Sequence, residues 1–341
     1  MTGNQIRQTA TPAAGSPQAL SVEVSPGRSF WGDARRRLLR DPSTIACMIV
    51  IGIYALVALG GVYYDFASER GWYGWKSFQE MQDYDRINQP PSLERWTDIM
   101  GTDWSGKSVL VKTLLGAKVS MAVGLMANVI AVPLGMLLGA IAGFYSGRFS
   151  KGGVIDDLIV WFYSTLACIP GIILLISLKF AFKGVVLFRG TPLALDLSGI
   201  HGLYIALAVV SWIGTCRLVR AEVMKIRELD YVLAARATGR GNLAILLRHV
   251  MPNVMHLGII NFSLGFVGAV QSEVILSYLG LGVAVGTPSW GTMINSARMD
   301  LLTGKWWELS AAVTAMFFLV LALNIFGDRL RDALDPRLKN V

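Results

Sequence analysis

Charged side chains are scarce in this chain of 341 residues. Asp, Glu, Lys and Arg make up 16% of it, and hydrophobic residues make up 53%, whereas soluble globular domains carry about 25% charged residues. The shortage is concentrated in long uncharged stretches rather than spread evenly. The composition therefore argues against a pair of soluble domains and predicts a protein for which lipid is much of the solvent.

Cysteine and histidine are also scarce, with three of each. The cysteines lie inside or at the end of apolar runs and lack the spacing of metal ligands, which predicts buried free thiols. They are Cys47, Cys168 and Cys216. Two histidines, His249 and His256, are seven residues apart, whereas a metal pair on one helix face prefers three or four. Hydrolase and metalloprotease motifs are missing too, so we expect no catalytic residue, no metal and no cofactor.

Long apolar runs are the main feature of the sequence. Six runs are each long enough to cross a bilayer as a helix. They cover residues 44–64, 119–144, 157–178, 202–221, 254–281 and 309–327. The stretch Leu158–Leu178 contains no charge and is the clearest, while Pro133 and Pro170 predict kinks. The sequence therefore predicts an all-α integral membrane protein with six transmembrane helices.

The fifth run is the least regular of the six. It is too long for one span and contains Gln271 and Glu273, so we expect a helix that ends or bends there, followed by a short second segment. An ionisable group inside a membrane is a functional candidate. Glu273 therefore has two readings, a role in the translocation pathway or in gating, and a structural role in holding a turn at the outer interface.

Positive charge predicts the orientation in the membrane. The chain has a formal net charge of +8, but its basic residues flank the apolar runs instead of forming a nucleic-acid-binding module. They are concentrated in the loop at 145–153, between the fourth and fifth runs, and after the sixth run. Since cytoplasmic loops are enriched in Lys and Arg, both termini and these loops are predicted to be cytoplasmic.

The chain is thereby divided into five parts. No short apolar core follows Met1, so no signal peptide is expected. The parts are a disordered cytoplasmic tail (1–28), a basic segment with the first transmembrane helix (29–64), an extracytoplasmic segment (65–118), a five-helix core (119–327) with a cytoplasmic loop at 222–253, and a cytoplasmic tail (328–341).

One segment matches a nucleotide-binding motif letter for letter. Gly101-Thr-Asp-Trp-Ser-Gly106-Lys107-Ser108 satisfies the P-loop pattern. The residues before it are polar rather than a buried strand, an acid, Asp103, lies inside the loop, and the predicted topology places the segment outside the cell. We therefore interpret it as a loop leading into the second span and not as a nucleotide site.

The most informative segment is the cytoplasmic stretch 230–252, which we call the elbow. Asp230 is a good N-cap, and the residues after it predict a short helix that ends at Gly239 in the C′ position. A second helical segment, 242–250, is expected to stop before Pro252. A helix–Gly–helix elbow in a cytoplasmic loop suits docking of another protein, and a helix lying on the membrane surface is the alternative.

These residues resemble a known family. Ala234-Ala235-x-x-x-Gly239, followed by Met251-Pro252, is similar to the EAA loop of permease subunits of binding-protein-dependent ABC importers, although Leu233 stands where that loop usually has Glu. Further stretches narrow the resemblance to the dipeptide/oligopeptide/nickel branch. They are Gly101–Leu125, Leu276–Gly282, Pro288–Gly291 and Gly327–Arg337.

The resemblance implies a fold, a location and partners. The fold would be that of a type I ABC-importer permease in the bacterial inner membrane, paired with a homologous permease, two cytoplasmic ATPase subunits and an extracytoplasmic solute-binding protein. ATP hydrolysis would occur on the ATPase subunits, so the chain itself would not be an enzyme. The residues implied in ATPase coupling are Tyr231, Ala234, Ala235, Gly239 and Pro252.

The solute and one alternative class stay open at this point. Peptides, nickel chelates and other small solutes are all carried within this branch, and the sequence does not choose among them. A stand-alone secondary transporter is the alternative, but it would require several ionisable groups at mid-membrane, and Glu273 is the one acid that stands in a clearly apolar run.

Overall fold

A computed structural model describes residues 30–72, 77–147, 153–191, 194–284 and 286–334. The predicted tail at 1–28 and residues 335–341 of the predicted C-terminal tail lie outside these ranges. Helices dominate the described residues. They are α1 Phe30–Leu38, α2 Pro42–Glu69, α3 Val109–Tyr145, α4 Gly153–Ala167, α5 Gly171–Ala181, α6 Ile200–Ile226, α7 Asp230–Ala237, α8 Asn242–Ile245, a π-helical segment Leu246–Val250, α9 Met251–Tyr278, α10 Trp290–Leu302 and α11 Trp307–Leu334.

Strands are confined to one small hairpin in the described part of the chain. β1 (Val186–Leu187) pairs antiparallel with β2 (Leu195–Asp196) between α5 and α6. Single-turn 3₁₀ helices lie in the described part of the segment before α3, at Phe78–Glu80, Tyr84–Arg86 and Trp96–Asp98. The all-α class predicted from the sequence is therefore confirmed.

Five helical stretches are long and apolar enough to cross a membrane. They are α2, α3, α6, the continuous stretch Asn242–Tyr278 that ends with α9, and α11. A sixth crossing is available if α4 and α5 count as one span, although they meet at an angle of 92°. The kink predicted at Pro170 within the run Leu158–Leu178 is therefore confirmed, and it is a sharp break between two helices rather than a bend within one. Pro170 is the N-cap of α5, and because proline lacks an N–H and clashes with the preceding turn, the helix breaks there.

Several other boundaries differ from the expected ones. Pro133 lies inside the unbroken helix α3, which begins at Val109 rather than at 119. α9 continues past Gln271 and Glu273 to Tyr278, so the helix does not end at these two residues, which was one of the two expectations for this run. The Glu273 carboxylate accepts a hydrogen bond from Ser277 Oγ, one turn further along, at 2.6 Å. This bond satisfies one oxygen of the carboxylate within the helix, which can therefore continue.

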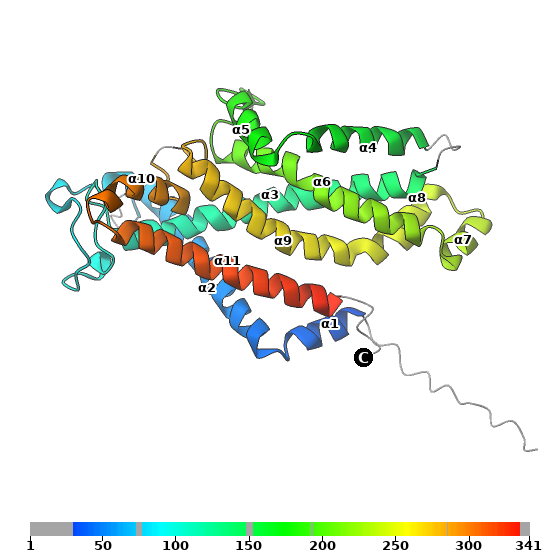
Figure 1. Ribbon diagram of the computed structural model, residues 1–341, viewed down its shortest axis with the longest axis horizontal. Coiled ribbons are helices and arrows are strands. Elements are labelled where there is room, and N and C mark those ends of the chain that lie inside the picture. The colour runs from blue at the N-terminus through cyan, green and yellow to red at the C-terminus, as the bar shows by residue number, and fades with distance from the viewer. Residues whose placement is uncertain (1–29, 73–76, 148–152, 192–193, 285, 335–341) are drawn as a thin grey trace, which may run out of the picture.

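The bundle is built around α3, which contacts α2, α4, α6, α9 and α11. Figure 1 shows these helices running along the long axis of the molecule, with α7 and α8 at one end and α10 at the other. We call these the α7 end and the α10 end. α1 and the last turns of α11 lie toward the α7 end, and the segment before α3 lies at the α10 end (Figure 1).

Three glycines let α3 approach α6 closely. Gly135, Gly139 and Gly143 recur every four residues and so share one face of α3. A methyl group added at each would lie 2.5–2.6 Å from a backbone carbonyl oxygen of α6. Small residues at four-residue spacing allow helix backbones to pack in a membrane, where lipid removes most of the hydrophobic driving force.

The cysteines are distributed between the interior and the surface. Cys47 and Cys216 are buried free thiols, as predicted, but Cys168 is exposed. Its position between α4 and α5, where the helix breaks, turns it away from the packed interior.

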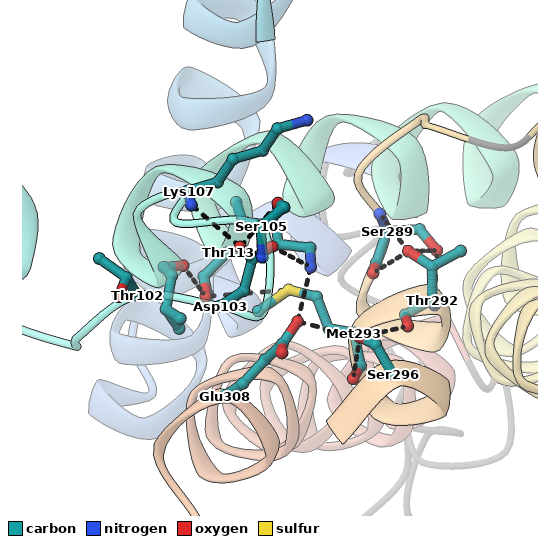
Figure 2. Close-up of polar contacts among 12 residues, drawn as sticks. Thr102, Asp103, Ser105, Lys107, Thr113, Ser289, Thr292, Met293, Ser296 and Glu308 are labelled. Atoms are coloured by element: carbon teal, nitrogen blue, oxygen red, sulfur yellow. Dashed lines mark hydrogen bonds and ion pairs between the residues drawn. The ribbon is translucent and has the colours of Figure 1, made fainter. Parts of the chain in front are cut away.

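The P-loop-like segment is a turn built around its own acid. Gly101 and Gly106 both have φ of 74°, which only glycine adopts readily. The Asp103 carboxylate accepts hydrogen bonds from the backbone N–H of Ser105 at 2.8 Å and of Lys107 at 2.9 Å. Figure 2 shows this carboxylate turned into its own loop. The amides that would hold a phosphate in a true P-loop are thus occupied by Asp103.

A buried ion cluster attaches this turn to the bundle. Lys112 Nζ in α3 donates to Asp103 at 2.9 Å and to Glu308 in α11 at 2.6 Å, and Ser296 of α10 also donates to Glu308 (Figure 2). Asp103 is 2% exposed. Burial opposes its ionisation, but the Lys112 ammonium and the hydrogen bonds outweigh this and hold the pKa of Asp103 below its usual range.

We expect Gly139→Ala to destabilise the protein by about 1–3 kcal/mol, the usual cost of overpacking, because the new methyl would meet the carbonyl oxygen of Cys216. Gly52→Ala in α2 is the matched control, since no atom lies within 4 Å of the added methyl, and alanine favours a helix by about 1 kcal/mol over glycine. Thermal unfolding in detergent measures both. Equal midpoints for the two variants would contradict the close approach of α3 to α6.

We expect Asp103→Asn to lower stability by about 2 kcal/mol at pH 7, because it removes a charged partner of a buried ammonium. A folded-state pKa below the unfolded value of about 3.9 stabilises the fold above that value, and the contribution is lost as the pH falls through the folded pKa. The difference between wild type and variant should therefore shrink below about pH 4. Thermal scans from neutral to acid pH measure it.

Asp85→Asn serves as the control for that experiment, because Asp85 is an exposed acid in the same segment. It should leave the midpoint near the wild-type value at every pH. A loss as large as that of Asp103→Asn would mean that the ion cluster contributes nothing specific.

Candidate functional site

The elbow lies at the α7 end, and Arg227, three residues before it, is attached to α3. α6 ends at Ile226. The guanidinium of the next residue, Arg227, donates to the backbone carbonyls of Gly143 at 3.2 Å and Ser146. These carbonyls belong to the last turn and the C-cap of α3, where positive charge is favoured by the helix dipole. The start of the elbow is therefore fixed to α3.

α7 has one face turned into the protein and one face turned out. Val232 is completely buried and packs, with Ala235 beside it, on a cluster formed by α3, α6 and α9. The Arg236 guanidinium lies over the Phe144 ring, 5.7 Å from its centroid. Tyr231 and Ala234 are exposed. The predicted coupling residues are thus divided, with Ala235 mostly serving attachment and Tyr231 and Ala234 available to another surface.

α7 ends as the sequence predicted but does not begin as predicted. Gly239 has φ of 78°, as expected of a glycine at the C′ position. Asp230, however, is the first residue of α7, and the N-cap is Leu229, with no side-chain capping bond. The predicted Asp230 cap is therefore wrong. The burial of Val232 and Ala235 holds α7 in place, so packing replaces capping here.

The second half of the elbow does not stop before Pro252. α8 passes through the π-helical segment into α9, and Pro252 lies in the first turn of α9, where its missing N–H is tolerated. The Met251 N–H donates to the Leu246 carbonyl, five residues earlier. The expectation of a helix end was wrong because the wider π turn accommodates the proline ring.

Several exposed apolar side chains of the elbow region were not singled out by the sequence analysis. Leu243 is 65% exposed and Leu247 53% exposed, and Leu229 and Leu233 are exposed as well. Large exposed apolar groups at the polar end of a membrane bundle indicate an interaction surface. Their signal in the sequence is the presence of five leucines among the basic residues of the loop at 222–253.

Asn253 is a further residue that the sequence analysis missed. Its side-chain amide donates to the Tyr231 hydroxyl at 3.0 Å, so it joins α9 to α7. Partial burial raises the pKa of Tyr231, against a smaller opposing effect of this hydrogen bond, so the phenol remains protonated at neutral pH. Through Asn253, the neighbouring Pro252 is brought close to the other predicted coupling residues.

Glu273 lies far from the elbow. It is completely buried in α9, 20 residues beyond Asn253 and so about 30 Å along the helix. One of its carboxylate oxygens accepts from Ser277, and the other has no hydrogen-bond partner. Ser277 lies against Gly282, in the turn that leads to α10, and against Gly291, in the first turn of α10. The predicted site residues therefore form two separate groups, one at each end of the bundle.

Two family models match most of the chain. Residues 135–340 match the family described as the binding-protein-dependent transport system inner membrane component. Residues 29–91 match the N-terminal TM domain of oligopeptide transport permease C. Together the two matches include α1, α2, the last third of α3 and the helices from α4 to α11.

Individual relatives are similar along almost their whole length. The dipeptide transport system permease protein DppC of Bacillus subtilis is 30% identical over 92% of this chain and 88% of its own. The glutathione transport system permease protein GsiD of Escherichia coli is 33% identical over 92% of both chains. The oligopeptide transport system permease protein OppC of Haemophilus influenzae is 31% identical over 91% of this chain and 90% of its own.

A solved structure of the MetNI methionine ABC transporter in an inward-facing conformation is 18% identical, with a TM-score of 0.48, over 67% of this chain and 96% of that one. This likeness is too weak to carry an argument, and the assignment depends on the family matches and on the relatives. The chain belongs to the family of inner-membrane permease components of binding-protein-dependent ABC transporters, multi-pass membrane proteins whose transporters hydrolyse ATP on separate subunits.

Proposed function

We propose that this chain is one of two homologous permease subunits that together line the translocation path of an ATP-driven importer. Two ATPase subunits bind at the elbows, and an extracytoplasmic solute-binding protein delivers the solute. The observation that carries the proposal is the elbow itself. It presents Tyr231, Ala234 and exposed leucines outward, while Val232 and Arg227 attach its first half to the helices that would move.

The outward residues of α7 fit a docking role by size and polarity. Ala234 allows a partner surface to approach closely, while Leu233 and Leu243, 43% and 65% exposed, offer apolar anchors. Leu233 stands where the family motif usually has an acid, so docking here relies on apolar contact rather than on an acid-mediated one. Gly239 sets the direction in which the chain leaves α7.

Movement of the ATPases would reach the spans through α7. Closure of the two ATPases on ATP displaces the docked helix, and its buried face transmits the displacement to α3, α6 and α9. Alternating access then follows from tilting of these helices. Tyr231, Ala234, Ala235, Gly239 and Pro252 act as coupling residues in this scheme, not as catalytic ones.

The orientation proposed is that both termini and the elbow are cytoplasmic. α1 and the end of α11 lie toward the same end of the bundle as α7 (Figure 1), and the basic residues gather there, as the positive-inside rule expects. The P-loop-like turn and Glu273 then lie on the extracytoplasmic side, in the inner membrane of a bacterium.

The solute class proposed is peptides or similar small solutes. The support is the named cargo of the similar permeases, which is dipeptides, oligopeptides and glutathione. Glu273 has a structural role in this proposal, because it is buried beside the turn between α9 and α10 and has a partner in its own helix.

The docking proposal is tested by the double variant Ala234→Arg with Gly239→Val. An arginine in an apolar contact lacks a partner, and valine cannot adopt the positive φ of Gly239 without strain. We expect co-purification of the ATPase subunits to fall about tenfold or more, since each 1.4 kcal/mol of lost affinity is a factor of ten. Insertion of the permease into the membrane should be normal.

The control is Leu302→Arg with Gly304→Val at the α10 end. Leu302 is 80% exposed, and Gly304 has φ of 82° with open space around it, like Gly239. It therefore introduces the same charge and the same backbone strain away from the elbow, and co-purification should be retained. Normal co-purification with the elbow variant would refute docking at α7.

A further inference from the structure

Polar contacts among four residues connect the two halves of the elbow to each other and to α9. The Asn253 side-chain amide donates to the Tyr231 hydroxyl at 3.0 Å and to the backbone carbonyl of His249 at 2.6 Å. A guanidinium nitrogen of Arg240 lies 3.0 Å from His249 Nε2. We call Tyr231, Arg240, His249 and Asn253 the elbow clamp. It joins α7, the turn after it, the π-helical segment and α9.

The clamp spans a weak point of the backbone. The π-helical segment Leu246–Val250 contains one residue more per turn than an α-helix allows, and π turns are rare outside functional sites. Pro252 supplies no N–H, so the backbone hydrogen-bond ladder has a gap immediately after this segment. A joint of this kind lets α7 and α8 shift relative to α9 unless another contact holds them.

The connection through Asn253 differs from an ordinary asparagine bond within a helix. Asn261 in α9 and Asn324 in α11 each donate to the carbonyl four residues earlier, at 2.8 and 2.9 Å. Asn253 makes the same bond to His249, but its amide also reaches Tyr231 on another helix. An amide nitrogen has two hydrogens, so both bonds form together.

From these contacts we propose that Asn253 is a positioning residue that locks α7 to α9 across the π-helical segment, so that displacement of the docked helix is carried to α9. The proposal rests on the docking of ATPases at α7. Without the clamp, α7 remains attached to α3 through Val232 and Arg227, but the π-helical segment absorbs the movement before it reaches α9. Docking and ATP hydrolysis continue, while movement at the far end of α9 is lost.

The experiment measures that movement without needing the solute. The full transporter, co-expressed with its partner permease and ATPases, carries spin labels at Leu279→Cys, at the end of α9, and Val186→Cys, in β1 after α5. The exposed Cys168 is replaced by Ser, because Cys47 and Cys216 are buried. Electron spin resonance records the distance between the labels with and without ATP and vanadate, and ATP hydrolysis and ATPase co-purification are measured in parallel.

With the clamp intact, trapping should shift the distance. With Asn253→Ala, the shift should fall to half or less while co-purification and ATP hydrolysis are retained. Tyr231→Phe, which removes only the hydroxyl, should reduce the shift similarly, and the double variant should be no worse than either single one, because both remove the same bond. Asn261→Ala should keep the full shift.

The outcomes separate the two proposals. No shift with the clamp intact contradicts the proposed function. A full shift in both Asn253→Ala and Tyr231→Phe overturns the clamp alone. Loss of ATPase co-purification with Asn253→Ala also overturns it, since Asn253 would then serve docking rather than transmission.

Discussion

The close contact of α3 with α6 is the constraint on which the bundle depends. Three glycines at four-residue spacing bring the carbonyls of α6 so near that no side chain fits between the backbones. In lipid, such packing supplies the attraction that the hydrophobic effect supplies in water. Because α6 leads directly into the elbow and α3 receives the hydrogen bonds of Arg227, the same contact determines where α7 sits. The packing that holds the spans together therefore also sets the position of α7.

The two ends of the bundle are stabilised by different chemistry. At the α10 end, a buried ammonium is shared between two carboxylates, and a loop wraps its own acid. These charges join the turn to α3 and α11, although one oxygen of the Glu308 carboxylate has no hydrogen-bond partner. At the α7 end, α7 is attached by the burial of Val232 and by the hydrogen bonds of Arg227 and Asn253, and leucines beside it remain exposed. The first arrangement suits a rigid closure and the second a surface completed by a partner.

A feature could be predicted from the sequence where the residues that form it lie close together along the chain. The apolar runs predicted the spans, and Gly239 predicted its turn, because each depends on residues a few positions apart. Rejection of the nucleotide site was also within reach, since Asp103 stands inside the loop. What the acid does there was not, because its partner Lys112 reaches it from α3 and is shared with Glu308 of α11. Asn253 was missed for the same reason, as its partner Tyr231 is 22 residues away. The break at Pro170 was underestimated, because a charge-free run looks the same whether the helix is straight or bent.

Because α9 is long, a small rotation at the elbow displaces the other end of the helix by several ångströms. The helix has 28 residues from Met251 to Tyr278, which is about 42 Å of rigid rod. Pivoting at its first turn by about 5° would displace its other end by roughly 4 Å, about two-thirds of the height of one helical turn. That other end contains Glu273 and leads, through a short turn, into α10. Under the docking proposed above, a small rotation at the elbow becomes a larger shift at the far end of α9, and this chain needs no separate moving domain to produce it.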